Sequence, residues 1–233
     1  MKQFAVFVLV ILCSGLTGCI DEVEEEFEWP EPTEFNCDIS PNFNLECELY
    51  MEGLDTPHHS ISNPKNGDLW IIYLNGFVKS WNGEELGDVA DLTSFVNRCH
   101  MEQGLLGMAF DEDFNTSGTV LISYIEEGSC DGPNDSDLIL ASMKVGENGL
   151  LDPSTISPLR NIEQPYRNHN GGHLISIGNN QYLWGIGDGG SANGPENNGQ
   201  DSSNSLGSIN LFSYHDGEIS PVINNTEKDP YVL

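Results

Sequence analysis

Short apolar runs separated by Gly, Asn, Asp and Pro make up the chain from about residue 36 onward. Residues 68–74 and 77–81 are two such runs; Asn75-Gly76 joins them, and Asn82-Gly83 follows the second. Asn-Gly supplies the positive φ angles of a tight hairpin, so two such pairs in succession predict an antiparallel meander. Further strands are predicted at residues 119–125, 138–145, 182–186 and 209–214.

No stretch after residue 36 keeps a 3.6-residue apolar period, so the fold is predicted to be all-β, either a sandwich or a propeller. Several segments repeat the order strand, Asn/Asp-Gly turn, strand, which favours a β-propeller. A four-stranded blade takes roughly 40–50 residues, so this part of the chain has room for about three to four blades. We therefore expect the chain as given to hold a truncated propeller.

The first 19 residues carry the pattern of an export signal. One Lys precedes an apolar run at residues 4–12, which is too short for a comfortable membrane span. The sequence Leu16-Thr17-Gly18-Cys19 resembles the lipobox of prokaryotic lipoproteins, which implies cleavage before Cys19 and lipid attachment to its thiol. We expect residues 1–18 to be a signal peptide and the protein to be exported to the cell envelope, lipid-anchored to the outer side of a prokaryotic membrane. An ordinary signal peptide is the alternative.

Residues 19–35 are predicted to form an extended tether, because they are acidic and contain two prolines. Beyond the tether, the chain has an even set of four cysteines. In an exported protein such a set predicts two disulfides. Pairing between sequence neighbours would give Cys37–Cys47 and Cys99–Cys130, although the sequence leaves the connectivity open.

The charge balance excludes some partners. Eight Lys and Arg against 37 Asp and Glu give a formal net charge of −29. Such a surface repels nucleic-acid phosphates and anionic lipid headgroups. We therefore expect no nucleic-acid partner, and contact with a membrane only through the lipid anchor.

Candidate chemistry is concentrated in residues 169–207, HNGGHLISIGNNQYLWGIGDGGSANGPENNGQDSSNSLG. The imidazole of His169 titrates near neutral pH and can act as a general base, which Asp188 could orient. The structural alternatives are a histidine that satisfies backbone groups at a strand entry and an aspartate in an Asp-Gly turn. Oxygen atoms of residues 189–201 could bind calcium, but the spacing is not that of an EF-hand, so a solvated loop is favoured.

Three further histidines are expected to have no chemical role. His173 is predicted to lie on the strand after His169 and to be structural. His58 and His59 follow Pro57, where the first blade is expected to begin. We expect both to be exposed to solvent, because the sequence offers no identifiable further ligands for a metal there.

Two motifs resemble the soluble glucose/sorbosone dehydrogenase family. One is residues 102–114, EQGLLGMAFDEDF. The other is the run H-x-G-G-x-L, a strand, G-D-G-G, a polar loop ending in Gln200-Asp201, and then L-G, within residues 169–207. Members of this family are six-bladed β-propellers that use pyrroloquinoline quinone (PQQ) with calcium, and they have non-enzymatic relatives. The resemblance covers roughly residues 55–233, and it implies that residues 36–233 are the N-terminal part of such a propeller.

The resemblance also implies roles for individual residues. His169 would be the catalytic base that takes the proton from the anomeric hydroxyl of a sugar, with the Asp188 carboxylate beside it. Glu102 stands where the glucose enzymes have a Gln that contacts the quinone, and Asn193 and Gln200 are assigned as further cofactor contacts. The implied reaction is oxidation of an aldose to its lactone, with electrons passing through PQQ to an external acceptor.

One departure from the family supports an alternative function. Ser208 stands where the family usually has Lys, and the chain has only eight Lys and Arg in all. PQQ carries three carboxylates, so its binding needs cations. The alternative is a non-catalytic propeller that recognises a glycan or a protein at the cell surface.

Overall fold

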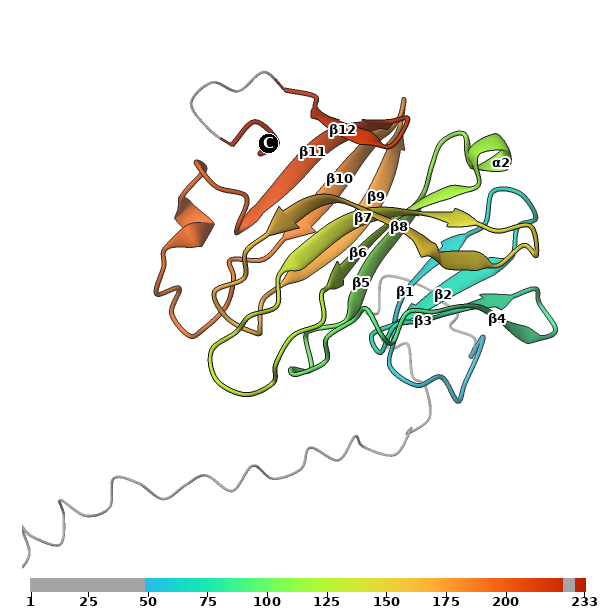
Figure 1. Ribbon diagram of the computed structural model, residues 1–233, viewed down its shortest axis with the longest axis horizontal. Coiled ribbons are helices and arrows are strands. Elements are labelled where there is room, and N and C mark those ends of the chain that lie inside the picture. The colour runs from blue at the N-terminus through green and yellow to red at the C-terminus, as the bar shows by residue number, and fades with distance from the viewer. Residues whose placement is uncertain (1–48, 224–228) are drawn as a thin grey trace, which may run out of the picture. The chain divides into compact units, whose positions relative to one another are not determined.

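The computed structural model describes residues 49–223 and 229–233, and residues 53–233 form one compact unit. This part contains three four-stranded antiparallel sheets, each built from strands that are consecutive in the chain (Figure 1). The all-β prediction is confirmed. The predicted signal peptide, the tether, the lipidated Cys19 and the Cys37–Cys47 pair lie outside the described residues.

Spatial order follows sequence order within each sheet. The first sheet contains β1 (Pro57–Ser62), β2 (Leu69–Tyr73), β3 (Phe77–Trp81) and β4 (Leu86–Asp91). The second contains β5 (Leu105–Phe110), β6 (Thr119–Ile125), β7 (Leu138–Val145) and β8 (Leu151–Ile162). The third contains β9 (Gly171–Gly178), β10 (Gln181–Ile186), β11 (Ser208–His215) and β12 (Glu218–Pro221). The six strands located by range in the sequence are all present, with ends within one residue of those predicted.

Helical structure is minor in the described part of the chain. It consists of α2 (Phe114–Ser117) and the 3₁₀ helix η1 (Asn198–Gln200). Neither is long and apolar enough to span a bilayer.

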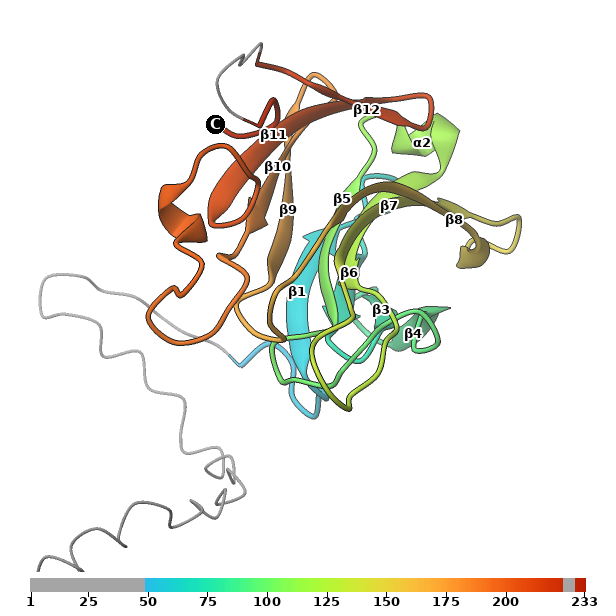
Figure 2. The ribbon, with the colours of Figure 1, turned by 60° about the vertical axis from the view of Figure 1, so that its left-hand side comes forward.

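The first strands of the three sheets, β1, β5 and β9, lie side by side, with β5 in the middle (Figure 2). The other strands of each sheet extend outward from this inner group. Inner strands that meet around a common centre are the arrangement of propeller blades. The described residues therefore form part of a β-propeller, with three blades.

The middle blade is buried on both faces. One core cluster joins it to the first blade through residues such as Trp70, Ile72 and Ile122. A second cluster joins it to the third blade, where Trp184 Nε1 donates a hydrogen bond to Ser123 Oγ at 2.9 Å. This explains the sequence pattern, because β6 is buried at every position whereas β10 alternates between buried and half-buried residues.

Two glycines set how closely the second and third blades approach. A Cβ on Gly107 of β5 would lie 2.2 Å from the carbonyl oxygen of Gly172 on β9. A Cβ on Gly172 would in turn lie 2.6 Å from the Leu106 Cβ. Both separations are shorter than atoms tolerate, so β5 and β9 can pack at this distance only because these residues lack side chains.

We expect Gly107→Ala to lower the free energy of unfolding by about 1–3 kcal/mol, because the added methyl group forces two packed backbones apart. Gly185→Ala is the matched control, since a Cβ at that strand position would meet no atom within 4 Å. It should leave stability unchanged or slightly raised. Chemical denaturation of both variants measures the difference, and equal stabilities would contradict this account of the blade contact.

Candidate active site

The backbone of His169 is held in an unusual conformation immediately before β9. Its φ angle is 55°, a left-handed value that few non-glycine residues adopt. Its N–H donates a hydrogen bond to Glu102 Oε2 at 2.5 Å. Its carbonyl oxygen lies against Gly187, where a Cβ would come within 1.7 Å. A residue of the second blade and a glycine of the third therefore fix the position of this histidine.

His169 and Asp188 form a side-chain pair. The distance from His169 Nδ1 to Asp188 Oδ1 is 2.9 Å. The pair forms because β9 and β10 are antiparallel neighbours, so the residue before β9 and the residue after β10 lie at the same edge of the sheet. If Nδ1 carries the proton donated to Asp188, Nε2 is the nitrogen that can accept one. The side chains are 45% and 32% exposed, so both are accessible from solvent.

Local hydrogen bonds keep the carboxyl of Asp188 ionised. The Gly190 N–H donates to Asp188 Oδ1 at 3.1 Å, and this bond is the main cause of a lowered Asp188 pKa. The hydrogen bond and the charge of His169 lower the pKa further, whereas partial burial opposes them. An ionised Asp188 stabilises a protonated imidazole at Nδ1, which is the arrangement a histidine base requires.

Two asparagines that the sequence did not single out shape the loop around Asp188. Asn198 Nδ2 donates to the Asp188 carbonyl oxygen at 2.9 Å. Asn168 Oδ1 accepts the Ser191 N–H at 3.0 Å and lies where a Cβ on Gly190 would clash. Both act on the backbone of a loop rich in Asn and Gly, so no spacing distinguished them from their neighbours.

The other predicted cofactor residues are not gathered around the histidine. Asn193 is exposed on the polar loop with a φ of 65°. Gln200 Nε2 donates to the carbonyl of its neighbour Gly199 at 2.9 Å, so its amide is turned toward its own loop. The Glu102 carboxylate is already engaged by the His169 backbone. Cofactor contact by these three residues stays a prediction.

The Cys99–Cys130 disulfide is confirmed, with a Cα–Cα distance of 5.0 Å. It ties the segment that leads to Glu102 to the loop between β6 and β7. Arg167, two residues before His169, holds the same loop by donating to the carbonyl oxygens of Ser129, Gly132 and Pro133 at 2.9, 2.9 and 3.2 Å. The disulfide loop thus anchors the chain on both sides of the Glu102–His169 contact.

The described residues do not by themselves fit the acidic cofactor or the calcium ion that the sequence motifs imply. The guanidinium of Arg167 is occupied by three carbonyl oxygens. Ser208, at the position where the motif usually has Lys, donates its hydroxyl to the Ser205 carbonyl at 2.6 Å. Within residues 49–223 and 229–233, no three His, Cys, Asp or Glu side chains form a metal-binding group. This side of the site offers a base, a carboxylate and neutral hydrogen-bonding groups.

The pH dependence of folding tests the ionised state of Asp188. A lowered folded-state pKa means that this carboxylate stabilises the protein above the ordinary carboxyl pKa of about 4, and that the contribution is lost as pH falls through the lowered value. The difference in unfolding free energy between wild type and Asp188→Asn should therefore be largest near neutral pH and shrink in acid. Denaturation at several pH values measures it.

His169→Gln is the matched variant for that experiment. Since the Gly190 N–H is the main cause of the lowered Asp188 pKa, His169→Gln should keep most of the pH dependence. Its complete loss would show that the imidazole, rather than the Gly190 N–H, sets the ionisation of Asp188.

Comparison with known proteins agrees with the fold and the motifs. The sequence model of the glucose/sorbosone dehydrogenase family matches residues 54–233. The PQQ-bound aldose sugar dehydrogenase from Streptomyces coelicolor superposes with a TM-score of 0.62 at 20% identity, over 79% of this chain and 52% of that one. The apo-form soluble aldose sugar dehydrogenase from Escherichia coli gives 0.61 at 20% identity, with the same coverage. A glucose dehydrogenase gives 0.62 at 18% identity, over 79% of this chain and 56% of that one.

At these identities the structural likeness establishes the fold, and the chain spans about half the length of the solved structures it matches. The family match is independent of them and covers the whole described propeller. The chain therefore belongs to the glucose/sorbosone dehydrogenase family.

Proposed function

We propose that the protein takes part in PQQ-dependent oxidation of an aldose at its anomeric carbon, which yields a lactone and passes electrons to an external acceptor. Membership of the family supports the reaction class. The observation that carries the proposal is the accessible His169–Asp188 pair, joined at 2.9 Å on the rim of the propeller. A base oriented by a carboxylate is what removal of a hydroxyl proton requires.

In this proposal His169 Nε2 accepts the proton of the anomeric hydroxyl. Asp188 holds Nδ1–H and stabilises the imidazolium that forms, while Glu102 and Gly187 fix the backbone that carries the ring. A positioned base of this kind typically contributes about 10²–10⁴ in rate. The proposal requires cations for the cofactor carboxylates beyond those described, so PQQ and calcium remain part of the proposal rather than of this site.

One observation favours a second candidate function. The cation nearest to His169 in the sequence, Arg167, is committed to backbone carbonyl oxygens. A propeller with the same base and carboxylate but no cofactor would act as a binding module that recognises a glycan or a protein at the cell surface.

Reconstitution of the protein with PQQ and calcium, followed by dye reduction with a panel of aldoses, separates the two functions. We expect turnover, and we expect His169→Gln to reduce it by at least about 100-fold, because the base is removed. His215→Gln is the matched control, since His215 ends β11 and contacts Asn180 at the β9–β10 turn. Absence of turnover in wild type would support the binding module, and full activity of His169→Gln would show that another group is the base.

We also propose that the protein is exported and lipid-anchored through Cys19 to the outer side of a prokaryotic membrane, where an external acceptor would be accessible. The support is the lipobox-like sequence directly after the apolar run. Metabolic labelling with a fatty acid should mark the wild-type protein, and Cys19→Ala should abolish the label. Equal labelling of both would rule out this anchor.

A further inference from the structure

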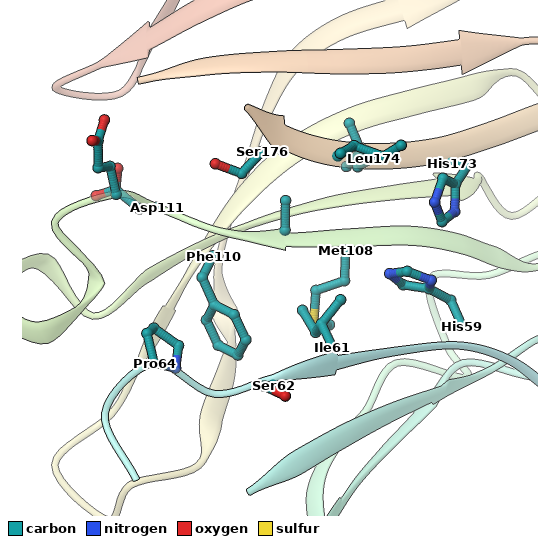
Figure 3. Close-up of a pocket in the computed structure, with 13 residues that line it drawn as sticks. His59, Ile61, Ser62, Pro64, Met108, Phe110, Asp111, His173, Leu174 and Ser176 are labelled. Carbon is teal, nitrogen blue, oxygen red and sulfur yellow. The ribbon is translucent and has the colours of Figure 1, made fainter. Parts of the chain in front are cut away.

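Two histidines from different blades meet beside the inner strand of the middle blade. His59 lies on β1 and His173 on β9, with β5 between the two strands. Their ring centroids are 4.4 Å apart, and the rings meet edge to face at 89°. Figure 3 shows the two imidazoles directed toward one another across the end of a cavity. The sequence predicted His59 to be exposed, but it is half-buried because β9 lies close by.

A β-bulge brings a third imidazole into the neighbourhood. The pairing register of β1 with β2 shifts between Pro57 and His59, so His58 is the extra residue. His58 is hydrogen-bonded to the backbone of Leu106 and is close enough to His173 for the charge of one to disfavour protonation of the other. Three of the six histidines of the chain are therefore grouped at the junction of the three blades.

The His59 ring has an unused donor atom. His59 Nε2 is buried and has no hydrogen-bond partner among the described residues. Leaving a buried polar atom unpaired costs about 1–3 kcal/mol, so such an atom is a natural point of ligand binding.

The cavity beside this atom has room for a ligand and its water. It has a volume of about 380 Å³ and extends from the histidine pair, past Met108 and Phe110, toward Asp111. The side chain of His173 is exposed, so the end of the cavity that carries the histidines can be reached from solvent.

Both neighbouring imidazoles on β1 favour the neutral form. Burial, followed by the charges of His173 and His58, lowers the pKa of His59 to about 4. Burial is also the largest cause of the lowered pKa of His58, and Arg98 adds to it. A neutral imidazole has the free lone pair that a metal ion requires. The net charge of −29 also raises the local concentration of cations.

We propose that His59 and His173 form an exchangeable site for a late divalent transition metal, Cu²⁺ or Zn²⁺, with water completing the coordination. With a metal–nitrogen distance of about 2.0–2.1 Å, each ring centre lies about 3.2 Å from the ion, and two ligands at a right angle have ring centres about 4.5 Å apart. The observed separation is 4.4 Å. Rotation of the rings about their Cβ–Cγ bonds then turns one nitrogen of each toward the shared point.

The make-up of the site sets its selectivity and strength. No closed group of three His, Cys, Asp or Glu ligands exists in the described part of the chain, so the ion is held by two protein ligands and remains exchangeable. Imidazole favours Cu²⁺ over Zn²⁺ and both over Mn²⁺, and it does not favour Ca²⁺. The site is separate from the His169–Asp188 pair and does not rest on the proposed function.

Calorimetric titration of the full chain, purified without a histidine tag, with Cu²⁺ and with Zn²⁺ tests the proposal. We expect His59→Gln and His173→Gln each to bind one equivalent fewer, or to bind it at least about tenfold more weakly, than wild type, because each removes one of two ligands. His215→Gln is the matched control and should bind as wild type does. Ca²⁺ should give no heat that depends on either histidine.

Thermal unfolding provides a second readout that is independent of the number of background sites. Zn²⁺ should raise the Tm of wild type by more than that of His173→Gln, whose side chain is exposed and whose replacement should leave the fold intact. Identical binding and identical metal-dependent Tm shifts in wild type, in both single variants and in the double variant would overturn the proposal.

Discussion

The contact between the backbones of β5 and β9 is the constraint on which the rest of the structure depends. Gly107 and Gly172 allow the two inner strands to pack without intervening side chains. Because β5 follows Glu102 and β9 follows His169, the same contact brings the Glu102 carboxylate to the His169 N–H. The spacing of the blades and the placement of the candidate base are therefore consequences of one close approach. The disulfide loop, held by Cys99 and by Arg167, reinforces it from the outside.

Much of the fold could be predicted because the middle blade is buried on both faces and its strands read as continuous apolar runs. The strands that the sequence did not reveal lie at sheet edges. The 12-residue β8 contains Pro153 and Pro158, which argue against a strand unless one edge is free of pairing, as it is here. The β9–β10 turn uses Asn179-Asn180 in left-handed conformations, without the glycine that marks most such turns.

The candidate site was predictable to the extent that it depends on side-chain chemistry. His169 and Asp188 combine a titratable ring and a carboxylate one hairpin apart, and their pairing follows from antiparallel strands. Asn168, Asn198 and Arg167 were not predictable, because they bind backbone atoms whose positions exist only in the folded chain. The same reason explains why His59 and His173, 114 residues apart in the sequence, gave no sign of their contact.

The alternation along β9 separates two tasks that the strand performs. Gly172 and Leu174 are buried in the contact with the middle blade, whereas His173 and Ile175 are exposed. A substitution at one of the exposed positions changes the lining of the cavity without altering the inter-blade core, and a substitution at a buried position does the reverse. Binding chemistry in the cavity can therefore diverge between related propellers one residue at a time, while the architecture that supports it is inherited intact.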